Sequence, residues 1–156
     1  MWFSRKQVAK SPPSQAGVLA GQREASQITT KRLGDAAESL ALAHLLKAGL
    51  KLVDTNYRTP GRGGGEIDLI MRAPDGTLVF IEVRQRSGQS HGGAGASIGA
   101  IKQQCIIFAA RHYLMRFNSL PPCRFDVVLV QGDLAAAAAV AEGGRIEWLR
   151  GAFDAS

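Results

Sequence analysis

The sequence predicts an α/β fold in which helices flank a central sheet. Two segments have helical periodicity, three β-type segments lie between them, and a fourth follows the second helix. A chain of 156 residues, 46% of them hydrophobic, amounts to about one domain with a sizeable core. We therefore expect the order helix, three strands, helix, strand, and then a small appendage.

Residues 1–33 form a basic leader on a nearly neutral body. The leader holds six basic residues and one acidic residue, a net charge of +5, which leaves +1 for residues 34–156. It is rich in Ser, Gln, Ala and Pro and has no sustained apolar period, so we expect it to be flexible. Such an arm is suited to contact a polyanion such as nucleic acid, and a merely solubilising tail is the alternative. The domain itself is expected at residues 34–154.

Composition also bears on the cellular compartment. The leader lacks the apolar core of a secretory signal, and the longest small-apolar run, residues 134–141, is far shorter than the roughly 20 residues that span a bilayer. We therefore expect a soluble, cytoplasmic protein without membrane contact. Because the leader is basic and poor in acids, import into an organelle stays open as the minority alternative.

The first half of the predicted domain begins with a helix over residues 34–49, which Gly49 ends and from which Glu38 projects. Residues 50–58 then have the pattern of a strand. The following Gly-rich loop, residues 59–65, resembles a phosphate cradle but leads into a strand and not a helix, as a dinucleotide loop would. A connector is the preferred interpretation, and a backbone site near a nucleic-acid phosphate is the alternative.

Two short strands joined by a turn carry the most informative charges. In residues 65–70, Gly-Glu-Ile-Asp-Leu-Ile, and 79–84, Val-Phe-Ile-Glu-Val-Arg, charges interrupt apolar neighbours at a spacing of two. The Pro-Asp-Gly turn at residues 74–76 folds the second strand back along the first. The charges that share a face are Glu66 with Asp68, and Glu82 with Arg84.

This hairpin is expected to bring Asp68 and Glu82 together. Unpaired buried charge is costly, and gathered carboxylates repel unless a cation lies between them. Hard oxygen ligands suit Mg²⁺ or Mn²⁺, whereas Zn²⁺ would normally recruit His or Cys. The sequence therefore predicts a divalent-metal site. Spacing alone leaves an alternative of two ordinary strands, with a solvated acidic face and a surface ion pair between Glu82 and Arg84.

The second half of the domain returns to helical spacing over residues 97–117, after a Gly-rich loop at residues 87–95 that contains His91. A β-branched strand follows at residues 124–131, and a short edge strand is predicted at residues 145–150. The Ala-rich segment between these strands is expected to be a short helix or an irregular insertion. The apolar stripe of the second helix is predicted to consist of Ile98, Ile101, Cys105, Phe108, Ala109, His112 and Met115.

Together these motifs resemble the YraN-like family, which is similar to Holliday-junction resolvases and belongs to the PD-(D/E)XK nuclease superfamily. The resemblance covers residues 34–154 and implies a restriction-endonuclease-like αβββαβ core with a mixed central sheet flanked by helices. The segments that carry it are Gly34 with Glu38, residues 56–58 (Asn-Tyr-Arg), the two strand motifs, residues 109–114 (Ala-Ala-Arg-His-Tyr-Leu), 124–128 (Arg-Phe-Asp-Val-Val), 146–148 (Ile-Glu-Trp) and 152–154 (Ala-Phe-Asp).

The resemblance implies roles for individual residues. Asp68 stands at the metal-binding aspartate, Glu82 at the acidic residue of the acid-x-lysine motif, and Glu38 at the first-helix glutamate of resolvase-like members. Arg84 occupies the position of the lysine. Arginine stays charged and cannot act as a base, but its planar fork can stabilise phosphate charge. The residues expected to contact nucleic acid are Arg58, Lys102 and Gln103.

The function implied is hydrolysis of DNA phosphodiester bonds, including those of branched DNA, with Mg²⁺ or Mn²⁺ held by Asp68 and Glu82. The alternative is a catalytically inactive nucleic-acid-binding module with the same fold. A homodimer also stays open, because a four-way junction offers two equivalent strands to cut.

Overall fold

The computed structural model describes residues 31, 33–86, 98–132 and 145–155. From residue 33 onward the chain forms one compact unit. Three predictions fall outside the described residues: the leader up to residue 30, the Gly-rich loop at residues 87–95 with His91, and the Ala-rich segment after Gly132. Within the described part of the chain, no helix is both long and apolar enough to cross a membrane.

The order of elements confirms the predicted α/β class. A helix is followed by three strands, a second helix and two further strands. The last strand is three residues longer than the sequence predicts and lies at the sheet edge, as expected. The elements are the N-terminal helix (described at residues 31 and 33–47), β1 (Lys51–Arg58), β2 (Glu66–Arg72), β3 (Leu78–Arg86), α2 (Ala100–Leu114), β4 (Cys123–Gln131) and β5 (Arg145–Phe153).

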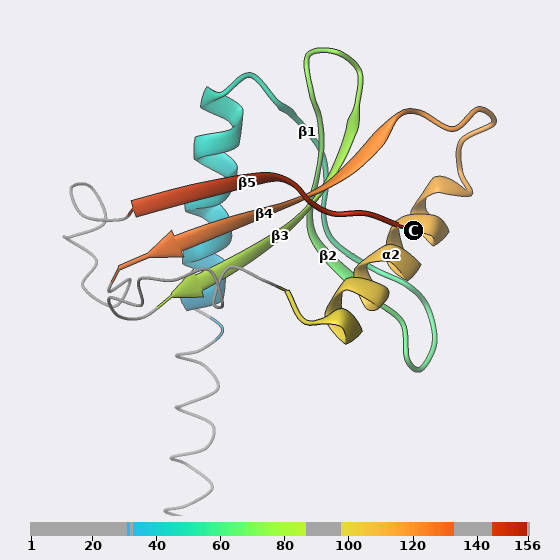
Figure 1. Cartoon of the computed structure of the whole chain (residues 1–156), viewed down its shortest axis with the longest axis horizontal. Coiled ribbons are helices and arrows are strands. Elements are labelled where there is room, and N and C mark those ends of the chain that lie inside the picture. Colours follow the sequence, from blue (N-terminus) through green and yellow to red (C-terminus); the bar gives the residue numbers. More distant parts are fainter. Residues whose placement is uncertain (1–30, 32, 87–97, 133–144, 156) are drawn as a thin grey trace, which may run out of the picture. The chain divides into compact units, whose positions relative to one another are not determined.

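The five strands form one mixed sheet in the order β1-β2-β3-β4-β5 (Figure 1). Strands β1 to β3 are antiparallel neighbours, β3 and β4 are parallel, and β5 is antiparallel to β4. A parallel pair cannot be joined by a tight turn, because the chain must return to the starting end of the sheet. The helix α2 lies in this return between β3 and β4.

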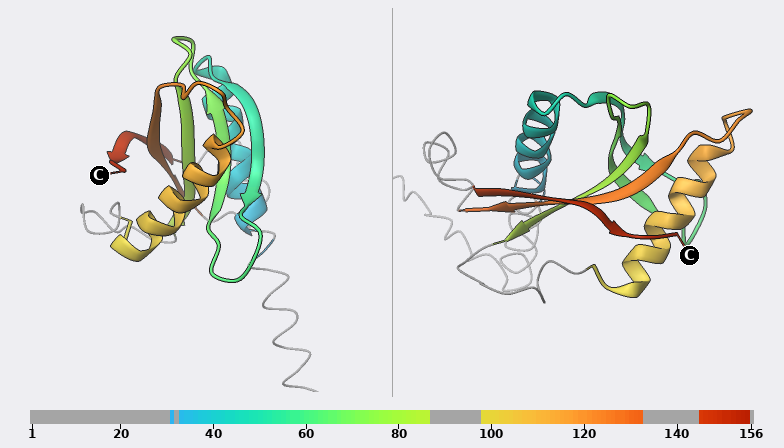
Figure 2. Two further views of the ribbon diagram at one scale, coloured as in Figure 1. Left: turned by 90° about the vertical axis from the view of Figure 1, so that its right-hand side faces the viewer. Right: turned by 45° about the horizontal axis from the view of Figure 1, so that its top comes forward.

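The two helices cover opposite faces of the sheet (Figures 1 and 2). Alternate residues of β3 divide between them: Val79 and Ile81 pack in the cluster of the N-terminal helix, and Leu78 and Phe80 pack in the cluster of α2. This alternation is the period of two that a strand imposes. A strand covered on both faces is apolar at nearly every position, so the charged Glu82 is conspicuous in β3.

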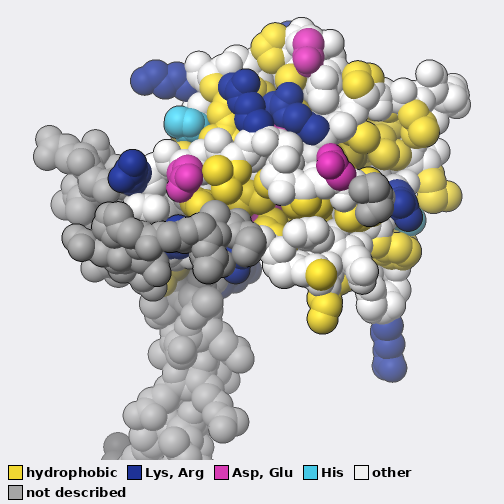
Figure 3. All heavy atoms as spheres, viewed as in Figure 1, with side chains coloured by type: hydrophobic (Ala, Val, Ile, Leu, Met, Phe, Trp, Pro, Cys, Tyr) yellow, Lys and Arg dark blue, Asp and Glu magenta, His cyan; other side chains and the backbone are white. Residues whose placement is uncertain are grey.

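The predicted apolar stripe of α2 is wrong at several positions. Ile101 and Met115 are each 80% exposed and Phe108 is 55% exposed, while Cys105 is only partly buried. Hydrophobic side chains accordingly reach the surface on the face shown in Figure 3. The face that packs on the sheet is instead formed by Ile106, Ala109, Ala110 and Tyr113.

Close packing explains why small residues of α2 face the sheet. A Cβ atom added at Gly65, just before β2, would lie 1.9 Å from the Cys105 carbonyl oxygen and 3.0 Å from Ala109 Cβ. Only glycine allows backbone to approach backbone this closely. The last residue of the loop at residues 59–65 therefore allows α2 to pack closely against the sheet. The ends of the loop are joined by a hydrogen bond of 3.1 Å from the Thr59 N–H to the Gly65 carbonyl.

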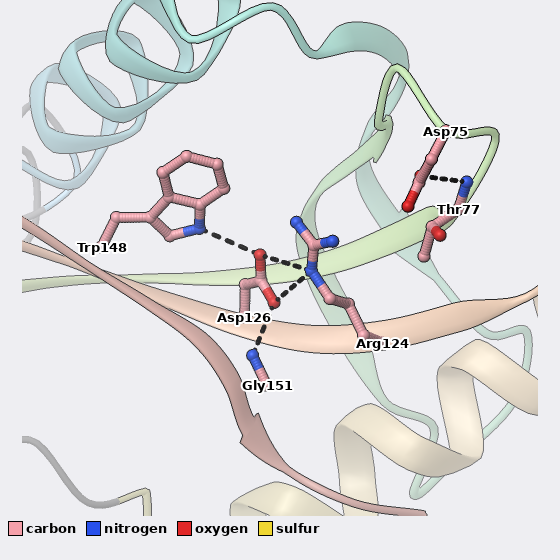
Figure 4. Close-up of polar contacts among 6 residues, drawn as sticks. All are labelled: Asp75, Thr77, Arg124, Asp126, Trp148 and Gly151. Atoms are coloured by element: carbon pink, nitrogen blue, oxygen red, sulfur yellow. Dashed lines mark hydrogen bonds and ion pairs between the residues drawn. The ribbon is translucent and has the colours of Figure 1, made fainter.

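A buried polar network fixes β5 to β4 (Figure 4). Asp126 on β4 is fully buried and accepts hydrogen bonds from Arg124 Nε, Trp148 Nε1 and the Gly151 N–H at 2.9–3.2 Å. Here residues 150–152 of β5 stand opposite Asp126 alone, and Gly151 has a φ of +57°. The carboxylate thus supplies the partners that a regular strand ladder would otherwise provide.

Candidate active site

The first predicted metal ligand, Asp68, lies where β2 and β3 separate. Their ladder pairs Leu69 with Ile81, and one residue further Asp68 Oδ2 accepts a hydrogen bond of 2.8 Å from the Val83 N–H. The carboxylate therefore occupies the position of a backbone acceptor. This contact fixes the Asp68 side chain beside the second predicted ligand on β3.

That second ligand, Glu82, is a buried and incompletely satisfied acid. The residue is only 8% exposed, and its Oε1 atom lies 3.3 Å from Lys102 Nζ at the start of α2. Its Oε2 atom is buried without a hydrogen-bond partner. Asp68 is adjacent, but two carboxyl groups can hydrogen bond only when one of them carries a proton. When both carboxyl groups are ionised they repel each other, and a further cation bound between them would relieve this repulsion.

The pKa values of Glu82 and Asp68 are both raised by their buried, adjacent positions. Burial and then the negative charge of Asp68 raise the pKa of Glu82 to about 7, although Lys102 acts in the opposite direction. Burial also raises the pKa of Asp68, against the Val83 N–H and the charge of Lys102. Desolvation and like charge are the two causes expected for carboxylates in one pocket. Because Glu82 is buried, the alternative of a surface ion pair at this position is wrong.

A third carboxylate, Glu38, approaches from the N-terminal helix. Burial and then the charge of Asp68 raise its pKa, while a hydrogen bond from the Asn56 side chain lowers it. Asn56 on β1 has a φ of +50°, a left-handed conformation that few residues other than glycine adopt. Among the residues that the structure describes, no group of three or more His, Cys, Asp or Glu side chains is placed to hold a metal ion. Glu38 therefore contributes to the local field more directly than to ligation.

The other predicted site residues are spread around this centre. Arg58 forms a surface ion pair of 2.8 Å with Glu66, and Arg84 is exposed on β3 two residues beyond Glu82. Gln103 Nε2 donates a hydrogen bond of 2.8 Å to the Ile98 carbonyl. The structure thus brings together Asp68, Glu82 and Lys102, with Glu38 nearby, and leaves Arg58 on the surface.

Sequence reasoning missed two features of this centre. The resemblance implied that Lys102 faces the site or the DNA backbone, but it did not identify Lys102 as the cation beside Glu82. Its signal is that it is the first charged residue of a helix with no acid in its first turn. Asn56 was quoted as part of a motif without a role, and only the fold reveals that it faces Glu38.

The donor set fits a hard divalent cation. Mg²⁺ is commonly bound through one or two carboxylates together with water and substrate phosphates, so Asp68 and Glu82 suffice for such a site. The unpartnered Glu82 Oε2 atom is the structural observation that favours this fit. Mn²⁺ suits the same oxygen ligands.

Comparison with known proteins places the chain in a family. Residues 37–130 match the family described as Uncharacterised protein family UPF0102. The chain belongs to the UPF0102 family. It is 67% identical over 156 residues to the UPF0102 protein of Polaromonas sp. strain JS666 and 66% identical over 157 residues to that of Polaromonas naphthalenivorans, with both chains covered completely. A UPF0102 protein of Methylibium petroleiphilum is 58% identical over 132 residues, covering 83% of this chain and 99% of the relative. These matches confirm the YraN-like resemblance inferred from the motifs.

Proposed function

We propose that the protein is a metal-dependent nuclease that hydrolyses phosphodiester bonds of DNA. The observation that carries this proposal is the buried pair of Asp68 and Glu82, which faces Lys102 and leaves one carboxylate oxygen without a partner. A pair of buried acids with raised pKa values in contact with a cation is typical of a functional site. Charges of this kind in a hydrophobic core are otherwise costly to the fold.

Each residue of the centre has a distinct task in this proposal. A divalent cation bound by Asp68 and Glu82 supplies Lewis-acid stabilisation and a water of lowered pKa. The Val83 N–H holds Asp68 in its orientation, and Glu82 anchors the Lys102 ammonium group within 3.3 Å. Lys102 can then stabilise negative charge that develops on the phosphoryl oxygens.

Lys102 also answers the difficulty raised by Arg84. The superfamily pattern calls for lysine two residues after the acidic residue, where this chain has arginine. An ammonium group nevertheless reaches the same acidic residue from α2, half-exposed and therefore accessible to a substrate. We assign the charge-stabilising role to Lys102 and a phosphate contact to the exposed Arg84.

A DNA-binding module without catalysis is the second candidate. It is favoured by the arginine at position 84, and by the finding that no group of three or more His, Cys, Asp or Glu among the described residues is placed to hold a metal ion. In that case Lys102 and Arg84 would contact phosphates, and affinity would fall with salt but survive chelation of metal ions.

The deciding experiment is a cleavage assay on labelled linear, flapped and four-way-junction DNA with Mg²⁺ or Mn²⁺. We expect metal-dependent cleavage that Asp68→Ala abolishes and that Lys102→Met slows about 100-fold. Glu147→Gln, which removes an exposed acid on β5, is the matched control and should cleave normally. Branched substrates should be cut in preference to linear duplex.

Two results would contradict the proposal. The first is metal-dependent cleavage that persists in a folded Asp68→Ala variant, because a contaminating nuclease would then be its source. The second is metal-independent DNA binding with no cleavage of any substrate, which would support the binding module. Circular dichroism of each variant separates loss of activity from loss of folding.

A further inference from the structure

The side of α2 that faces away from the sheet carries a row of exposed hydrophobic side chains. Ile101 and Met115 are each 80% exposed, and Phe108 between them is 55% exposed. The three residues recur every seven positions, so they lie in line along the helix and its C-terminal cap. In Figure 2, no described helix or strand lies over this side of α2.

The fold does not require apolar groups in this row. The sheet is packed by the opposite face of α2, which uses other residues such as Ile106 and Ala109. Of the seven large hydrophobic residues that are exposed in the described part of the chain, four lie at positions 101 to 120. Single exposed hydrophobic residues are ordinary, but a gathered set is typical of an interaction surface.

The spacing of the row matches that of a helix-pairing seam. Cys105 and His112 are half-buried and fall between the three exposed residues, so the set recurs at intervals of four and three. These are the a and d positions of a heptad repeat, which face a partner helix. We call these five residues the α2 seam.

The α2 seam is narrow. With 3.6 residues per turn, its five members fall within an arc of about 80°, which is less than the roughly 100° by which a helix packs on a broad apolar surface. A membrane surface would favour a wider apolar face. A second helix is therefore the occupant that the geometry favours.

The charges beside the α2 seam decide which helix fits. The helix contains no acidic residue, and basic side chains flank the seam on both sides. If two copies paired antiparallel about Phe108, Lys102 of one would meet Arg116 of the other. A parallel pair would set Arg111 against Arg116. Like charges at these positions disfavour a second copy, whereas a helix with acidic flanks complements them.

We propose that the α2 seam binds an acidic amphipathic helix of another protein. Apolar residues of that helix pack between Ile101, Phe108 and Met115, and its carboxylates pair with Arg111 and Arg116. The Arg116 guanidinium is already held at the edge of the seam, where its central carbon lies 3.6 Å from the centre of the Tyr113 ring. The contact needs neither DNA nor a metal ion, so it goes beyond the proposed function and does not depend on it.

The test is fluorescence anisotropy of three labelled synthetic peptides, each as long as α2. The first has Leu at the a and d positions with Glu beside them, the second has Lys in place of Glu, and the third has Ser in place of Leu. We expect the full chain to bind the Glu peptide at micromolar concentration and about tenfold more tightly than either of the others. Arg111→Glu should weaken binding of the Glu peptide and strengthen binding of the Lys peptide.

Two variants with exposed hydrophobic residues replaced locate the binding. Phe108→Ser changes the centre of the α2 seam and should weaken binding of the Glu peptide about tenfold. Leu46→Ser is the matched control, because Leu46 is 47% exposed on the N-terminal helix and lies outside the seam. It should bind the peptide as the wild type does. Unchanged binding by a folded Phe108→Ser protein overturns the inference.

Alkylation of Cys105 tests the location without changing the α2 seam. The chain has two cysteines, so in a Cys123→Ser variant Cys105 is the remaining thiol. The Glu peptide should slow its reaction with iodoacetamide, and the Ser peptide should not. An equal rate with and without the Glu peptide contradicts the proposal.

Other occupants of the α2 seam would also be recognised. Equal binding of the Glu and Lys peptides overturns the inference. So does a concentration-dependent dimer that Phe108→Ser abolishes, because a second copy would then be the occupant. Binding to vesicles of anionic lipid that the same variant abolishes would identify a membrane surface instead. All of these measurements are made without DNA, so the result of the nuclease assay does not affect them.

Discussion

Two buried carboxylates on adjacent strands, Asp126 and Glu82, differ in how completely their oxygen atoms are hydrogen bonded. Asp126 stands across the ladder from Ile81, next to Glu82, but the two acids point to opposite faces of the sheet. Asp126 accepts hydrogen bonds from a guanidinium, an indole and a backbone N–H. Glu82 has a single ion pair, a second carboxylate beside it and one buried oxygen without a partner. A fully satisfied acid stabilises the fold, whereas an acid left half satisfied is available to a ligand.

The largest effect is expected from Asp126→Ala. Its removal leaves Trp148 Nε1, the Gly151 N–H and Arg124 without their shared acceptor, so the free energy of unfolding should fall by about 3–5 kcal/mol. Urea denaturation in the presence of a metal chelator measures this change in the free energy of unfolding. The exposed Asp154→Ala is the control and should change little. If the two variants lose equal stability, the claim that Asp126 stabilises the fold through its hydrogen bonds is wrong.

Gly65→Ala should be next in size, because it forces α2, the helix that carries Lys102, away from the residue that precedes β2. The new Cβ would lie 1.9 Å from the Cys105 carbonyl oxygen, so we expect a loss of about 2–3 kcal/mol in unfolding free energy. Gly99→Ala meets open space and is the matched glycine control. A Gly65→Ala protein as stable as Gly99→Ala would contradict the close seating of α2.

Glu82→Gln tests whether Glu82 is a buried, incompletely satisfied acid, through the pH dependence of stability. Because burial and Asp68 raise the pKa of Glu82 from 4.5 to about 7, the folded state binds this proton more tightly than the unfolded state. The resulting stabilisation is complete below about pH 4.5 and is lost as the pH rises through 7. The glutamine of Glu82→Gln stays neutral at every pH. The free energy of unfolding of this variant should therefore be about 1–3 kcal/mol larger than that of the wild type at pH 8, and the difference should be smaller at pH 5.

Urea denaturation at both pH values, with metal ions chelated, measures this difference. Glu147→Gln serves as control, since its carboxylate is exposed on β5. The raised pKa would be refuted by wild-type and Glu82→Gln proteins that lose stability equally between pH 5 and pH 8.

The smallest predicted effect concerns the cation itself. Protons compete with metal ions for carboxylates, so the apparent affinity for Mn²⁺ should fall about tenfold for each pH unit below 7. Isothermal titration calorimetry at pH 6, 7 and 8 would measure it. Binding by Glu82→Gln should be weak and nearly independent of pH. Metal binding of equal strength in that variant would place the ion elsewhere.

The sequence predicted the fold well because strands and helices leave local periodic signals. The expected helices and strands have bounds within about three residues of the observed ones, and the turn at residues 74–76 brought Asp68 and Glu82 into one hairpin. The prediction of the buried face of α2 was wrong. Ile101, Phe108 and Met115 have helical spacing, but they lie on a face of the helix that does not pack on the sheet. Which face of that helix is buried depends on Gly65, a contact between residues about 40 positions apart in the chain.

For the site, the sequence by itself determined the family, the acidic residues and their strand positions, because these are written in the order of residue types along two strands. Only the tertiary structure decided that Lys102 faces Glu82 and that Asp126 is satisfied while Glu82 is not. These facts depend on how charges are paired and desolvated by distant segments. Burial and partnership are properties of the packed chain, so no local pattern of residues could have fixed them.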